Sequence, residues 1–151
     1  MSTTVVTDLR NAMVSEVAAE VGAGWSELAY VNDPQKNNFR QSKQGYGVRA
    51  LSAIQLPGVT KHVTFEQTFE VVLTKRYIQQ AVGDGRARDE ALSLQDEMLC
   101  IHKRLVNNKA GLPAQVMNVD ALTMEDIEFL DDDKVAVLVA QVVIQYRISL
   151  I

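Results

Sequence analysis

The chain has 151 residues, of which 47% are hydrophobic and 23% charged, and its formal net charge is -4. This composition is typical of a globular protein with a hydrophobic core and argues against intrinsic disorder. The acidic balance argues against a general nucleic-acid-binding protein, although a local basic segment can still contact phosphates. The length predicts a single domain over residues 1–151. The lone cysteine rules out an internal disulfide and fits a reducing compartment.

Two further features favour a soluble product of the cytoplasm. Residues 1–16 have no basic region followed by a continuous apolar run, so we expect no secretion signal. The longest apolar stretch, residues 135–144, is too short and too rich in β-branched residues for a membrane span.

Apolar residues at spacings of three and four predict an amphipathic helix at the start of the chain. They are Val6, Leu9, Met13, Val17 and Val21. Gly22 and Gly24 follow as termination signals. Residues 25–31 ("WSELAYV") then predict a short strand, and residues 47–54 ("GVRALSAI") a strand that returns after a long loop.

Residues 62–77 alternate between two kinds of side chain over an unusual length. One face carries Val63, Phe65, Gln67, Phe69, Val71 and Leu73. The other carries His62, Thr64, Glu66, Thr68, Glu70 and Thr74. Such a period of two predicts a half-buried antiparallel strand.

The period then changes to that of a helix, over residues 87–107. The predicted buried stripe is Ala91, Leu94, Met98, Ile101 and Leu105. Acidic residues in the first turn and basic residues in the last suit the helix dipole. Gly111 and Pro113 follow the helix as termination signals.

The rest of the chain predicts β-structure at residues 114–122 and 126–130, a turn at 131–134 and a long strand over 135–148. The first half of the last strand is apolar on both faces, which predicts a central position in a sheet or a place beneath a neighbouring subunit. The element order therefore predicts an α+β fold, with a mixed or antiparallel sheet and two amphipathic helices on one face. A long extended arm loop is expected at about residues 32–47.

No catalytic constellation is evident, so we expect no enzyme, no cofactor and no metal site. His62 and His102 are far apart and lack partners at metal-ligand spacing. Cys100 falls in the middle of a helix without an adjacent base, and we expect it to be a packing residue. Two G-x-G sequences lack the context of a phosphate-binding loop and are interpreted as turns.

An acidic segment precedes the last strand. Its members are Asp120, Glu125, Asp126, Glu128, Asp131, Asp132 and Asp133. A calcium or magnesium site is one interpretation. A solvated hairpin tip is favoured, because the spacing matches no EF-hand loop.

The segment 34–49 is basic in an otherwise acidic chain. It carries Lys36, Arg40, Lys43 and Arg49, and no Asp or Glu. A solvated loop without a role, a phosphate contact and a protein contact are the three interpretations. The composition suits phosphate contact, but four cations provide only modest affinity at physiological salt.

Length favours the protein contact. Extended as a hairpin, the arm would reach roughly 25 Å, compared with a radius of gyration of about 15 Å for a compact chain of this size. A basic arm and an acidic patch would together form a head-to-tail interface between copies, which closes into a ring if the rotation allows. The doubly apolar half of the last strand is the expected source of apolar burial in that ring.

The chain resembles the tail terminator (tail-to-head joining) proteins of long, flexible-tailed bacteriophages. The likeness rests on the opening helix, "ELAYVND" (27–33), "NNF" (37–39) and "YGVRALSA" (46–53). It continues through "VTFEQTFEVVLTKRY" (63–77), "ARDEALSLQDEMLCIHKRLV" (87–106) and "VAVLVAQVVIQYRI" (135–148). The likeness covers nearly the whole chain and lies in the order of the elements and their general residue pattern.

The resemblance implies a structural virion protein that assembles in the host cytoplasm as a hexameric ring on the head-proximal end of the tail. Such a ring stops polymerisation of the tail tube protein, docks the head-tail connector or neck protein, and lets genomic DNA pass without sequence-specific contact. From composition, the expected subunit or tube contacts are Lys36, Phe39, Arg40, Lys43, Asp131, Asp132 and Asp133.

Two alternatives stay open. One is another ring-forming neck, head-tail connector or tail completion protein. The other is a small intracellular domain that binds or hydrolyses a phosphorylated ligand through Arg49, Arg76, Arg86 or Arg88. That activity requires a pocket with convergent polar groups.

Overall fold

The computed structural model of the protein describes residues 4–28, 44–58, 61–77, 85–107, 111–130 and 135–149. The elements in chain order are α1 (Val5–Val21), β1 (Ser26–Glu27), β2 (Gln44–Gln55), β3 (His62–Arg76), α2 (Arg86–Asn107), β4 (Val116–Met124), β5 (Glu128–Leu130) and β6 (Val135–Ser149). Two helices and a mixed sheet confirm the predicted α+β class.

The strand order of the sheet is β1-β2-β3-β6-β4, and β5 also pairs with β6. The long strands β3 and β6 are antiparallel partners along their whole length, from His62 opposite Ser149 to Arg76 opposite Val135. The predicted central position of the last strand is therefore confirmed.

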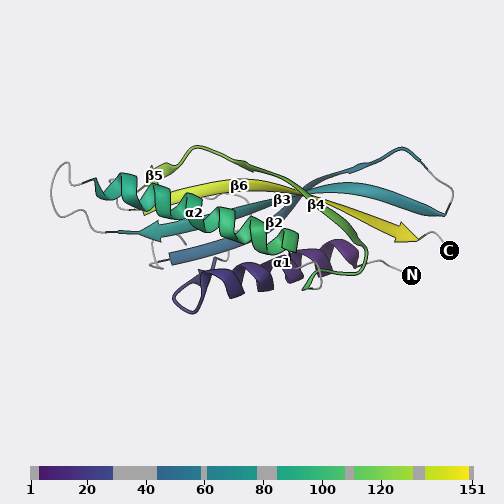
Figure 1. Cartoon of the computed structure of the whole chain (residues 1–151), viewed down its shortest axis with the longest axis horizontal. Coiled ribbons are helices and arrows are strands. Elements are labelled where there is room, and N and C mark those ends of the chain that lie inside the picture. Colours follow the sequence, from purple (N-terminus) through teal and green to yellow (C-terminus); the bar gives the residue numbers. More distant parts are fainter. Residues whose placement is uncertain are drawn as a thin grey trace.

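Both helices pack on the same face of the sheet, as predicted (Figure 1). α1 presents Leu9, Met13 and Val17 to the core, and α2 presents Leu94, Met98, Ile101 and Leu105. The strands meet them with a continuous apolar face: Tyr46, Val48, Phe69, Val71, Leu73, Ala136, Leu138, Ala140, Val142, Ile144 and Tyr146. Gly22 ends α1, with φ 87° and its N–H donated to the carbonyl of Ala18 over 3.1 Å.

The opposite face of the sheet is buried at one end. Val135 and Val137 of β6 pack there with Val72 of β3 and Leu28, which follows β1. The prediction that β6 begins buried on both faces is confirmed. Because this burial is completed within the chain, the expectation that this half of the strand supplies the apolar contact of a ring is wrong.

The expected half-burial of β3 holds only for its first part. From Phe69 to Thr74 both faces of the strand are buried. Glu70 is tolerated there because Arg49 of β2, directly opposite in the register, lies 3.1 Å from its carboxylate.

The first strand and the arm differ from expectation. β1 comprises two residues, and the predicted arm ends earlier than expected, since Gln44–Gly47 belong to β2. β1 and β2 are parallel, so they are not the two sides of an antiparallel hairpin, as the returning strand implied. A parallel neighbour needs a crossover connection, and residues 29–43, which lie between the two strands in the sequence, fall outside the described residues.

The far end of the β2–β3 hairpin extends past both helices, together with the end of β6 (Figure 1). Residues 50–55 of β2 are all exposed. Phe65 of β3, opposite Gln55 at the end of β2, stacks on Tyr146 of β6 with ring centroids 5.6 Å apart. Within the described residues, no strand pairs with the outer edge of β2 beyond Tyr46.

Candidate assembly surfaces

The seven residues predicted to make subunit or tube contacts lie outside the described residues. Lys36, Phe39, Arg40 and Lys43 fall in residues 29–43, and Asp131, Asp132 and Asp133 in residues 131–134. Their contact role stays a prediction.

The residues that flank the 29–43 segment are described, and they lie close together. Leu28 donates its N–H to the carbonyl of Tyr46 over 2.7 Å. Gly45 is buried against Leu28, and a Cβ added at Gly45 would lie 2.6 Å from Leu28 Cδ2 and 2.9 Å from Thr74 Oγ1. The arm therefore starts from a closely packed root in which only glycine fits at position 45.

Asp120, the first residue of the acidic segment, makes two local contacts. The backbone oxygen of Asp120 lies 2.8 Å from His102 Nε2, and the Asp120 carboxylate accepts a hydrogen bond from Asn118. The structural role expected for His102 fits this contact. No three His, Cys, Asp or Glu side chains gather into a metal-binding group in the part of the chain that the structure describes.

Ion pairs anchor both ends of α2. Glu90 is buried at the start of the helix, 2.8 Å from Lys75 Nζ and 3.2 Å from Arg86 Nε. Near the end of the helix, Arg104 lies 2.6 Å from Glu16 of α1. Sequence reasoning missed these contacts, because a period of hydrophobic residues carries no signal for a polar pair between distant segments.

The uncovered face of the sheet is polar beyond its buried end. Besides the pair of Arg49 and Glu70, Gln145 of β6 donates a hydrogen bond to Glu66 of β3 over 3.0 Å. Arg147 is exposed farther along β6. This face thus carries charges of both signs in a hydrogen-bonded arrangement, which suits contact with water or with a polar partner.

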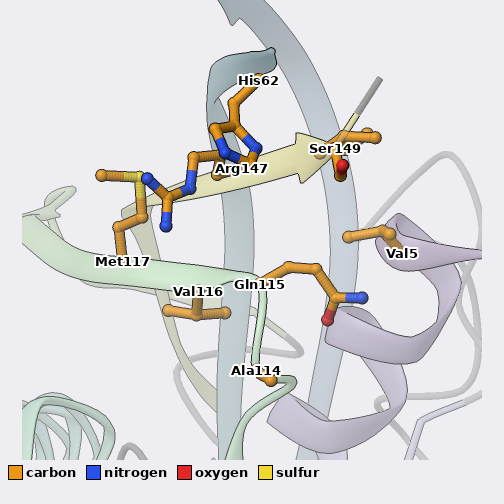
Figure 2. A pocket seen from close by; sticks show the side chains of 9 residues that line it. Val5, His62, Ala114, Gln115, Val116, Met117, Arg147 and Ser149 are labelled. Carbon is orange, nitrogen blue, oxygen red and sulfur yellow. The ribbon is translucent and has the colours of Figure 1, made fainter. Parts of the chain in front are cut away.

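A cavity of about 620 Å³ opens near the start of α1 (Figure 2). It is lined by Val5, His62, Ala114, Gln115, Val116, Met117, Arg147, Ile148 and Ser149. Figure 2 shows His62 and Arg147 on one side of it and Val5 with Gln115 on the other. His62 and Ser149 are opposite each other in the register of β3 and β6. A catalytic serine and histidine also need a carboxylate that orients the histidine, and none of the nine lining residues is a carboxylate.

The four arginines considered for a phosphorylated ligand do not line this cavity. Arg49 pairs with Glu70, Arg86 with Glu90, and Arg88 with Asp89. They lie on β2 and at the start of α2, while Arg76 ends β3. In the part of the chain that the structure describes, these four side chains therefore do not converge on the cavity near α1.

Large apolar side chains are exposed at three places in the described structure. Leu51 and Ile54 lie on the projecting part of β2, and Met117 lies on β4 beside the cavity. α2 exposes Leu92, Leu99 and Val106 on the side away from its buried stripe. Their spacing of seven residues was a signal for this second stripe that sequence reasoning did not use.

Cys100 is exposed, so the expectation that it packs in the core is wrong. It follows Leu99 on α2, one step outside the buried stripe formed by Met98 and Ile101. The described helices include none that is long and apolar enough to cross a membrane.

Comparison with solved structures shows that this fold is similar to that of a virion component. A chain in the virion of a native gene transfer agent particle matches with a TM-score of 0.54 and 13% sequence identity. The match covers 98% of this chain and 99% of that chain, so the two share a fold over their full lengths. No protein-family model matches the sequence, and no curated protein matches it either.

Proposed function

We propose that this chain is a structural virion protein, a tail terminator that forms a ring on the head-proximal end of a tail tube. The observation that carries the proposal is the full-length likeness to a chain in the virion of a gene transfer agent. The resemblance of the sequence to tail terminators supplies the position in the tail. The whole of residues 1–151 acts as one domain in this proposal, without enzymatic activity.

The surfaces of the chain support assembly with other proteins. The segment 29–43, which contains Lys36, Arg40 and Lys43, lies between Leu28 and the closely packed Gly45. We propose that its cations meet the acidic residues 131–133 of the next copy, in a head-to-tail contact that closes into a hexamer. Charge complementarity of this kind orients partners and speeds their encounter more than it adds affinity.

Apolar contact must then come from another part of the subunit, because the start of β6 is already covered by Leu28 and Val72. The projecting end of β2 is suited to this role, since Leu51 and Ile54 are exposed by 37% and 63%. It extends past the helices and therefore reaches beyond the body of its own subunit (Figure 1).

A terminator binds the tail tube protein on one side and the head-tail connector or neck protein on the other. The polar uncovered face of the sheet suits a lumen through which genomic DNA passes without specific contact. Another neck, connector or tail completion protein is the second candidate, since the same fold likeness supports any ring-forming virion component.

The first test is the solution mass of the purified chain, from light scattering after size exclusion at several concentrations and two salt levels. A hexamer, or a monomer–hexamer mixture that shifts toward monomer at high salt, supports the ring. The second test adds the chain to growing tail tubes and measures tube length by electron microscopy. Shorter, capped tubes support a terminator, whereas binding to the connector with unchanged tubes supports the second candidate. A chain that forms no ring and binds neither partner overturns both.

A further inference from the structure

The outer face of α2 carries an apolar stripe that its own chain leaves uncovered. Leu92, Leu99 and Val106 are exposed by 53%, 51% and 37%, while the opposite side of the helix is buried in the core. Fourteen residues of an α-helix make nearly four turns, so these side chains lie within about 40° of one another. This repeat of seven is the pattern by which one helix packs along another.

The charged residues beside the stripe have opposite signs before and after Leu99. Asp96 lies three residues before Leu99 and Lys103 four residues after it, both exposed. They are themselves seven residues apart and therefore lie on the same side of the stripe. Within the described residues, neither takes part in an ion pair with another side chain.

This order is self-complementary for two antiparallel helices. A twofold axis at Leu99 places Asp96 beside Lys103 of the second copy, with an axial offset of about 1.5 Å. It also places Leu92 opposite the second copy's Val106. A parallel pair would instead carry the flanking charges of the two copies to opposite sides of the seam, where Asp96 and Lys103 do not meet.

We propose that the outer stripe of α2 binds the same stripe of a second copy of this chain, antiparallel about a twofold axis at Leu99. The contact is isologous and ends at two copies, so it is distinct from the head-to-tail contact of the proposed ring. A stripe of three apolar side chains is smaller than a stable interface, so we expect a weak, concentration-dependent dimer.

Disulfide trapping tests the register. In a Cys100→Ser background, Leu99→Cys brings two thiols to the axis, within the separation of about 4.4–6.8 Å between Cα atoms that a disulfide needs. Leu92→Cys in the same background is the control, because its thiols would be about 21 Å apart along the axis. We expect a covalent dimer from Leu99→Cys under mild oxidation and none from Leu92→Cys. No dimer from Leu99→Cys, or equal yields from both variants, overturns the proposal.

Charge exchange tests the orientation without relying on a thiol. Asp96→Lys and Lys103→Asp should each weaken self-association several-fold in sedimentation velocity at low salt, and the double exchange should restore it. A double exchange that stays as weak as the single variants contradicts the antiparallel pair. Ring formation is scored separately by electron microscopy, so a failed ring with an intact α2 dimer overturns only the proposed function. Rings formed by a protein whose Leu99→Cys variant gives no covalent dimer overturn only the dimer.

Discussion

Arg104 of α2 donates from Nε to Glu16 Oε2 of α1 over 2.6 Å, across 88 residues of sequence. Its Nη1 also lies 3.5 Å from Glu20, and the side chains of Glu16 and Arg104 are only 12% and 32% exposed. The hydrogen bond to Glu16 raises the pKa of Arg104 above its ordinary value, so the guanidinium stays charged. This contact joins the two helices that cover the sheet.

Arg104→Met should lower the melting temperature, because it keeps the aliphatic stem but leaves the nearly buried carboxylate of Glu16 without its cation. Arg104→Lys should recover part of the lost melting temperature, since it restores the charge but not the paired contacts of Nε with Glu16 and Nη1 with Glu20. Thermal unfolding followed by circular dichroism measures both. Arg88→Met, at a site whose side chain is 74% exposed, is the control. Equal melting of Arg104→Met and Arg88→Met would contradict the role of the pair.

Gly45→Ala should destabilise the protein at the root of the arm. The added Cβ meets Leu28 and Thr74 at under 3 Å, and overpacking of this kind typically costs about 1–3 kcal/mol. For a chain of this size, each kcal/mol lowers the melting temperature by about 2–4 °C. Gly24→Ala is the matched control, because its nearest atom is the end of the Gln44 side chain at 3.3 Å. Similar melting temperatures for the two variants would show that the root is not tightly packed.

Val137→Asp should greatly reduce the yield of soluble, folded protein. Val137 is 2% exposed on the face where Val72 and Leu28 cover β6, and a carboxylate there has no partner within that cluster. Val139→Asp, two residues along the same face, should be milder because Val139 is only partly buried. The soluble fraction after expression measures both variants. A soluble Val137→Asp protein with wild-type melting would refute the double burial of β6.

Glu97→Gln should stabilise the protein at neutral pH. Burial, followed by the charge of Glu20, raises the pKa of Glu97 above its ordinary value, despite an opposing effect of Lys75. A carboxyl group whose pKa is higher in the folded state favours folding in its protonated form. Its stabilising contribution is therefore full below the unfolded pKa of about 4.3 and is lost as pH rises through the folded value.

The gain in stability of Glu97→Gln over the wild type should thus be present at pH 7 and vanish as the pH falls below about 4. Thermal unfolding across this range measures the difference. Glu125→Gln, which removes an exposed carboxylate, controls for the change in net charge. A gain that is the same at every pH would show that ionisation of Glu97 is not its cause.

Replacing Lys36, Arg40 and Lys43 together with Glu should weaken ring formation or tube binding without lowering the melting temperature. In the proposed ring, charge reversal in the arm would replace attraction to residues 131–133 of the next copy with repulsion. Replacement of the same three residues by Gln should give an intermediate loss, and Phe39→Ala tests the apolar part of the contact. Light scattering at low and high salt measures assembly. Wild-type assembly by the Glu variant would remove the arm from the mechanism.

The sequence by itself determined both helices, the two long strands and their packing as an α+β fold. Each of these elements has a hydrophobic period sustained over many residues, as in the stripe from Leu94 to Leu105 or the alternation from Ala136 to Tyr146. A period of 3.6 or 2 follows from backbone geometry alone, so it can be found without knowing the partners. The assembly residues in the arm and near residue 131 were inferred from charge only and stay predictions.

Only the tertiary structure decided which polar residues are buried and which apolar residues are left exposed. The burial of Glu70 depends on Arg49 in the opposite strand, and that of Glu16 on Arg104 in the other helix. The parallel pairing of β1 with β2 depends on a crossover that no local pattern of two residues can specify. Leu99 and Cys100 are exposed because the sheet covers only one side of α2. Such outcomes depend on contacts between distant segments, whereas a sequence period reports only on neighbours within one element.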